Sequence, residues 1–208
     1  MAGNNVNVFE MLEASRITQT SGKLGKGTPI ALEGPPGLGK TEMVRQYCES
    51  VNHYLYVVII ARTPSPDIEG FYIPDTEKGK VVHLTNGKLI GLETPEGYDG
   101  CCIFFDEFVN ATEETQTAVQ SMVQDGKLGD SEKDKNCWYV FAWNPTGSNC
   151  GSNELIQSMR SRLAVCPMMN DEDAAKQEGD RKGSPYISID RDLFPQWMEL
   201  AIEEWDID

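Results

Sequence analysis

A glycine-rich loop constrains this 208-residue chain more than any other feature of its sequence. Residues 34–41 match the pattern G-x-x-x-x-G-K-[ST] in full, between a predicted buried strand at Pro29–Leu32 and a predicted helix at Thr41–Ser50. Glycines let backbone N–H groups curl around phosphate oxygens, and the start of the helix adds a favourable dipole. The loop therefore predicts ATP binding with Mg²⁺, with Lys40 on the β- and γ-phosphates and the Thr41 hydroxyl on the metal.

The residues expected to touch the nucleotide form one continuous run. They are Gly34, Pro35, Pro36, Gly37, Leu38, Gly39, Lys40, Thr41 and Glu42. The structural alternative is an ordinary Gly/Pro turn, which does not account for a Lys-Thr pair between a strand and a helix.

Strand and helix patterns alternate along the chain. Apolar runs predict further strands at Tyr54–Ile60, Cys101–Phe105, Trp138–Trp143 and Leu163–Cys166. Helices are predicted at Val6–Ile17, Thr112–Gln124 and Asn153–Arg160, and a loop at Thr18–Thr28. The alternation predicts an α/β fold with three αβα layers around a five-stranded, mostly parallel sheet. Polar residues at the carboxyl ends of these strands should then meet at one edge.

Two stretches interrupt this alternation. Pro64, Pro66 and Pro74 indicate irregular chain after the second strand. Farther along, Val81–Leu84 and Lys88–Ile90 flank Asn86-Gly87, which predicts an inserted β-hairpin.

An acidic pair ends the third strand. Carboxylates there need partners, which makes Asp106 a candidate Mg²⁺ ligand and Glu107 a candidate base that polarises the attacking water. Taken alone, the pair is a weak signal and more often marks a strand end leaving the core. Its position downstream of Lys40 favours the catalytic interpretation.

Three further polar residues are candidates for catalysis. Asn144 ends the fourth strand and could orient the water or touch the γ-phosphate, although Asn-Pro is also a common turn dipeptide. Arg162, with Arg160 beside it, could neutralise charge on the transferring phosphate from a neighbouring subunit. The structural alternative for both arginines is a favourable cation near the end of a helix.

The composition narrows the possible partners. Lys and Arg number 18 and Asp and Glu 33, so the formal net charge is −15, which disfavours direct nucleic-acid binding. The six cysteines form no C-x-x-C pair, and neither His53 nor His83 suggests a metal site. No apolar run approaches the length of a membrane span, so we expect a soluble, cytoplasmic protein without membrane contact.

The ordered set of motifs resembles AAA+ ATPases of the MoxR and dynein-related branch, including short bacterial and phage versions. Residues 34–41 resemble Walker A, Cys102–Glu107 Walker B, and Phe141–Pro145 the sensor 1 strand. Arg160–Leu163 resembles the arginine-finger segment, with Arg162 at the family position, and Pro66–Gly70 resembles a segment after the second strand. The resemblance covers roughly residues 30–166.

This resemblance implies a homo-oligomeric ring, commonly a hexamer, with ATP at each subunit interface. It also implies remodelling of a protein partner, often one with a von Willebrand A domain. The inserted hairpin resembles those that contact partners in this branch, while a plain surface hairpin is the alternative. A phage-encoded chain would act in the host cytoplasm.

The C-terminal part departs from the resemblance. We divide the chain into an N-terminal helix and loop at 1–29, an ATPase core at 30–166, and a C-terminal segment at 167–208. The family's helical lid is longer and carries a sensor 2 arginine, whereas Arg181 and Arg191 lack a helical context and only Leu193–Trp205 has an apolar helical face. We expect the lid to be shortened, truncated, absent or supplied by another chain.

Three functions remain in competition. The first is an ATP-hydrolysing, oligomeric remodeller, which an intact Asp106-Glu107 pair favours. The second is a nucleotide-gated assembly module with slow or no turnover, which a short lid favours. The third is a small-molecule kinase, since Gly-Pro-Pro-Gly also occurs there, but the acidic pair and Asn144 argue against it.

Overall fold

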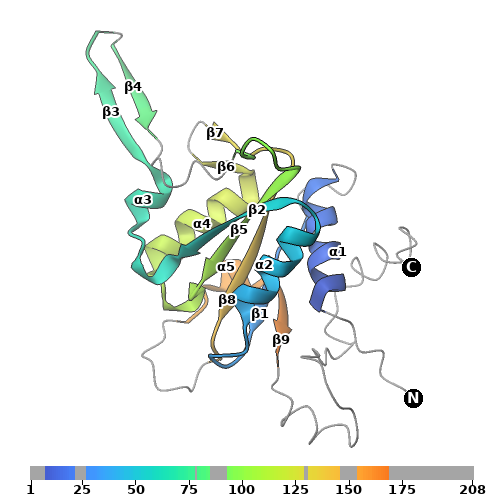
Figure 1. The fold of residues 1–208 in the computed structure, drawn as a ribbon. Helices are drawn as coiled ribbons and strands as arrows, with labels where there is room; N and C mark the ends of the chain where they lie inside the picture. Colours follow the sequence, from blue (N-terminus) through green and yellow to red (C-terminus); the bar gives the residue numbers. More distant parts are fainter. Residues whose placement is uncertain are drawn as a thin grey trace, which may run out of the picture.

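A five-stranded sheet forms the centre of the molecule (Figure 1). The structure is a computed structural model that describes residues 8–21, 27–77, 79–84, 93–128, 131–145 and 154–168. The strands are β1 (Ile30–Glu33), β2 (His53–Ile59), β5 (Gly100–Asp106), β8 (Cys137–Trp143) and β9 (Ala164–Pro167). They lie in the order β2-β5-β8-β1-β9, and all neighbouring pairs are parallel. The predicted parallel α/β fold is confirmed.

Helices cover both faces of this sheet (Figure 1). One face packs against α1 (Val8–Thr20) and α2 (Lys40–Ser50). The other packs against α3 (Ser65–Glu69), α4 (Glu113–Asp125) and α5 (Gln157–Arg160), with two short 3-10 helices, η1 (Ile60–Arg62) and η3 (Phe108–Asn110). Thr112 caps α4 by accepting the Thr115 N–H on its side chain.

Strand β8 shows why the sheet needs two helical layers. All seven of its side chains are buried. Cys137, Tyr139, Phe141 and Trp143 pack in the core under α4, whereas the alternating residues Trp138, Val140 and Ala142 pack under α1 and α2. Side chains of a strand alternate between faces, so a continuous apolar run specifies a strand covered on both sides.

Helix α1 continues farther than predicted. The sequence indicated a loop from Thr18, but the helix runs to Thr20 and buries Thr18 and Gln19. The Gln19 amide donates to the Tyr139 carbonyl (3.0 Å) and accepts the Tyr139 N–H (2.9 Å). Polar composition was misleading here because these polar side chains bond to buried backbone rather than to water.

Two small antiparallel ribbons stand outside the main sheet (Figure 1). One pairs β3 (Phe71–Asp75) with β4 (Lys80–Leu84), and the other pairs β6 (Lys127–Leu128) with β7 (Ser131–Glu132). The interpretation of Pro66 and Pro74 as irregular chain is wrong, since they lie in α3 and β3. Pro74 is tolerated because a two-stranded ribbon has an outer edge that needs no N–H donor.

The hairpin prediction is confirmed only in part. Val81–Leu84 is a strand, but its described partner is β3 rather than Lys88–Ile90. The Asn86-Gly87 turn and Lys88–Ile90 lie outside the described residues, as do Arg181, Arg191 and the predicted helix Leu193–Trp205. Among the described residues, no helix is both long and apolar enough to cross a membrane.

Helix α5 is shorter than predicted. It comprises Gln157–Arg160, and the preceding residues 154–156 are not helical. The Gln116 side chain accepts the Ile156 N–H (3.0 Å) and donates to the Glu154 carbonyl (3.3 Å). These backbone groups are therefore satisfied without a helical turn.

Candidate nucleotide-binding site

The glycine loop connects β1 to α2 at the carboxyl edge of the sheet. Gly37 and Gly39 have positive φ values of 86° and 75°, a conformation that disfavours other residues. A Cβ at either position would meet no heavy atom within 4 Å, so their surroundings are open. The Gly34 N–H donates to the Trp143 carbonyl at 3.1 Å, which anchors the start of the loop to β8.

Lys40, the first residue of α2, connects three parts of the site. Its ammonium donates to the Gly34 carbonyl (2.6 Å), the Pro35 carbonyl (3.1 Å) and Asn144 Oδ1 (3.0 Å). Three acceptors match the three donors of an ammonium group. Burial lowers the pKa of Lys40, while the charge of Asp106 opposes that shift.

Thr41 and Asp106 form an oxygen pair beside this lysine. The Thr41 hydroxyl donates to Asp106 Oδ2 at 3.3 Å. One Mg²⁺ can contact both oxygens because each Mg–O distance is about 2.0–2.1 Å. Among the described residues no group of three or more His, Cys, Asp and Glu could hold a metal alone. The donor set therefore fits Mg²⁺, which takes one or two protein ligands and completes its shell with phosphate and water.

Glu107 lies just beyond the end of β5 in an unusual conformation. Its φ of 56° and ψ of 34° place it in the left-handed region, and it is not a glycine. Its N–H donates to Asp106 Oδ1 at 2.9 Å, so the pair shares one tight turn. Strained residues of this kind cluster at active sites, and here the strain lies beside the Thr41–Asp106 pair.

The predicted residues at three strand ends therefore come together. Hydrogen bonds join Lys40 to Asn144 and Thr41 to Asp106, and Glu107 adjoins Asp106. Glu42 lies exposed in the first turn of α2, and its Oε2 is 3.4 Å from Arg45 Nε. A helix of this kind starting at the loop supplies the dipole that favours an anion.

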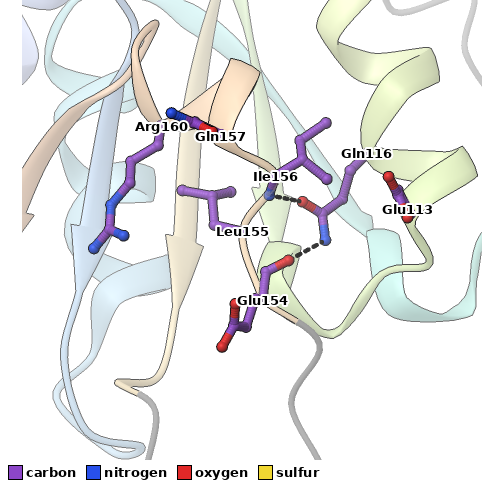
Figure 2. A pocket seen from close by; sticks show the side chains of 7 residues that line it. All are labelled: Glu113, Gln116, Glu154, Leu155, Ile156, Gln157 and Arg160. Atoms are coloured by element: carbon purple, nitrogen blue, oxygen red, sulfur yellow. Dashed lines mark hydrogen bonds between the residues drawn. The ribbon is translucent and has the colours of Figure 1, made fainter.

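The two arginines do not join this cluster. Arg162 donates to the Ser158 carbonyl (2.6 Å) and to Gln124 Oε1 (3.0 Å), and within the described part of the chain no hydrogen bond joins it to the glycine loop. Arg160 lines a pocket of about 610 Å³ between α4 and the chain preceding α5, and its side chain points away from Gln116 (Figure 2). It also lines a smaller pocket of about 210 Å³ with Glu33 and Trp143, at the ends of β1 and β8.

The glutamines of α4 were missed in the sequence. Gln116 is fully buried, and its amide bonds to the chain before α5 (Figure 2). One and two helical turns later, Gln120 accepts a hydrogen bond from the Ser158 hydroxyl and Gln124 accepts one from the Arg162 guanidinium. Their regular spacing was the available signal, since residues four apart share one face of a helix.

A known protein family matches the part of the chain that contains these residues. A family model described as an AAA domain of the dynein-related subfamily matches residues 29–163. No curated protein sequence matches the chain. Among solved structures, a "putative ATPase" from Cytophaga hutchinsonii is 16% identical, with a TM-score of 0.49. The match covers 94% of this chain and 64% of that one.

The family match extends over more than half of the chain. It begins just before β1 and ends between Arg162 and β9, and so contains the glycine loop, the acidic pair, Asn144 and both arginines. The chain therefore belongs to the AAA domain family, in its dynein-related subfamily.

Proposed function

We propose that this chain binds ATP with Mg²⁺ and hydrolyses it at sites shared between subunits of a homo-oligomeric ring. A hexamer is the first oligomeric state to test. The observation that carries the proposal is the joining of Lys40 to Asn144 and of Thr41 to Asp106 across three strand ends. A loop, a lysine, a metal-binding oxygen pair and a polar amide are the groups that phosphate transfer requires.

Each residue has a role in this proposal. The loop from Gly34 to Thr41, with Glu42 following it, holds the phosphates, and Thr41 and Asp106 hold Mg²⁺. When bound, the metal neutralises charge on the β- and γ-phosphates. Glu107 polarises the attacking water, and Asn144 orients that water or the γ-phosphate. Arg162 of a neighbouring copy, supported by Arg160, stabilises charge in the transition state.

The energy of hydrolysis would remodel or assemble a protein partner, with von Willebrand A-domain proteins as the first class to test. The β3–β4 ribbon supports a protein contact, because Phe71, Tyr72, Ile73 and Val81 are 53, 69, 46 and 61% exposed. Clustered exposed apolar side chains mark interaction sites. We propose that the protein acts in the cytoplasm. We also propose that the ATPase core at 30–166 carries the activity, with an N-terminal helix and loop at 1–29 and a C-terminal segment at 167–208.

A slow assembly switch is the second candidate. Its support is Arg162, which bonds within its own copy to Ser158 and Gln124 rather than to the nucleotide loop. In this candidate ATP binding drives assembly, and turnover stays slow or absent even where copies are in contact.

The test compares Glu107→Gln with Lys40→Ala. Glu107→Gln should bind a fluorescent ATP analogue normally and lose hydrolysis by about 100-fold or more, since base catalysis contributes about 10²–10⁴-fold. Lys40→Ala should lose binding itself. Unchanged phosphate release by Glu107→Gln would contradict the base assignment, and a wild-type protein that binds ATP but turns over slowly would favour the switch.

A further inference from the structure

Three glutamines lie on one face of α4 and contact the segment that carries Arg162. Gln116, Gln120 and Gln124 are spaced four residues apart within Glu113–Asp125. That spacing places them one above another, one helical turn apart. Each bonds to a successive part of the chain from Glu154 to Arg162.

The first glutamine also contacts the chain that leaves the acidic pair. Gln116 is 0% exposed, and its amide nitrogen donates to the Ala111 carbonyl (3.2 Å) as well as to the Glu154 carbonyl. Its oxygen accepts the Ile156 N–H (Figure 2). Ala111 directly follows η3, which starts one residue after Glu107. One buried amide therefore fixes the chain after Glu107 against the chain before α5.

The next two glutamines extend this contact to the arginine. The Ser158 hydroxyl donates to Gln120 Oε1 at 2.5 Å. The Arg162 guanidinium donates to Gln124 Oε1 at 3.0 Å and to the Ser158 carbonyl at 2.6 Å. A guanidinium has five N–H donors in a rigid plane. Among the described residues these two bonds use two of the five donors and fix the direction of the plane, so the other donors can face a phosphate.

We propose that Gln116, Gln120 and Gln124 are positioning residues that set the orientation of the Arg162 guanidinium for the nucleotide of a neighbouring copy. This inference rests on the proposed function of the same site. The glutamines touch no nucleotide themselves, and they act through Arg162 and through the chain around α5. Within one copy, contacts through η3, Gln116 and α5 also link Glu107, beside the proposed Mg²⁺ ligands, to Arg162, which would act on the neighbouring nucleotide.

Gln124 gives the cleanest test because it is exposed, so its replacement leaves the core intact. Gln124→Leu should lower the kcat for ATP hydrolysis by about 10- to 100-fold, since a small misplacement of a charged group has that cost. The KM for ATP and the affinity for a fluorescent ATP analogue should stay unchanged, because nucleotide binding depends on Lys40 and Thr41. Gln124→Glu keeps an acceptor oxygen at the same reach and should retain most of the activity.

Two further variants separate positioning from a general structural effect. Ser121→Leu places the same new side chain on the same helix, at an exposed residue whose hydroxyl donates to the Thr117 carbonyl of α4 (3.3 Å), and should keep wild-type kcat. Adding Gln124→Leu to Arg162→Ala should produce no further fall, because the two act through one group.

The outcomes distinguish this inference from the proposed function. A wild-type protein that hydrolyses no ATP under assembling conditions overturns both. An active wild type with an equally active Gln124→Leu overturns the positioning role alone. So does an additional fall in kcat in the Arg162→Ala background, since Gln124 would then act independently of the arginine.

Discussion

Among single residues, His53 shows how burial decides a charge state. Its ring accepts the Trp138 indole N–H on Nδ1 at 3.1 Å, and it is 7% exposed at the start of β2. Burial lowers the pKa of His53 below the ordinary value of 6.5, and the positive charge of Arg16 lowers it further. Protonation at Nδ1 would remove the acceptor that the indole needs.

The folded state should therefore lose stability as the pH falls. Because the pKa of His53 is lower in the folded than in the unfolded chain, the unfolded chain takes up a proton first. The contribution of His53 to the free energy of unfolding is then fully present above about pH 6.5. It decreases below that pH and stops decreasing below the pKa of the folded state. The total loss is about 1.4 kcal/mol for each unit by which folding lowers the pKa of His53. His53→Gln should show a shallower decrease in chemical-denaturation series between pH 8 and 5. Identical slopes for the two proteins would show that another group dominates.

At the scale of secondary structure, α1 completes the central sheet. Tyr139 lies just before the first residue of β8 that is in register with β1, and there the Gln19 amide pairs with both the N–H and the carbonyl of Tyr139. The Ser15 hydroxyl likewise accepts the Ile30 N–H at 3.1 Å. Two side chains of one helix therefore form hydrogen bonds with strand backbone of the kind that a neighbouring strand would form.

Removing this amide should destabilise the fold without touching the nucleotide site. Gln19→Leu removes the two hydrogen bonds that its amide makes to the buried backbone of Tyr139, and a buried backbone group left without a partner costs about 1–3 kcal/mol. Urea denaturation should show a loss of that order. Gln46→Leu is the matched control, since Gln46 is exposed on α2 and its amide donates to Glu42 Oε1 of the same helix. Equal effects from the two substitutions would contradict the role of Gln19.

The sequence predicted the five strands and the convergence of their polar ends because both follow from local patterns. Continuous apolar runs, as in β8, indicate strands buried on both faces, and parallel strands bring Lys40, Asp106 and Asn144 to one edge. It missed the end of α1, the short α5 and the α4 glutamines. In each case a polar side chain, Gln19 or Gln116, bonds to backbone far away in the sequence, and periodicity does not identify that partner.

At the scale of the whole molecule, the proposed site is divided between two regions of one copy. The loop with Lys40 lies at the strand ends, whereas Arg162 is bound to α4 and α5. Under the proposed function, a head-to-tail contact between copies would bring these two regions together, and such a contact forms a ring when its rotation closes. Such a contact must also overcome the formal net charge of −15 on each copy. Assembly should therefore be assayed at about 0.15 M salt or above, where the screening length is about 8 Å or less.

Mixing two inactive variants tests whether the site is shared. Lys40→Ala lacks nucleotide binding but keeps Arg162, and Arg162→Ala keeps binding but lacks the arginine. In a random one-to-one assembly about a quarter of the head-to-tail interfaces join an intact Lys40 to an intact Arg162. Phosphate release should return to about that fraction of wild type if sites act independently. Mixing Lys40→Ala with the double variant Lys40→Ala/Arg162→Ala should restore nothing, since no copy binds ATP. Absence of recovery in a demonstrated mixed assembly would place the arginine's action within one copy and remove the reason for a ring.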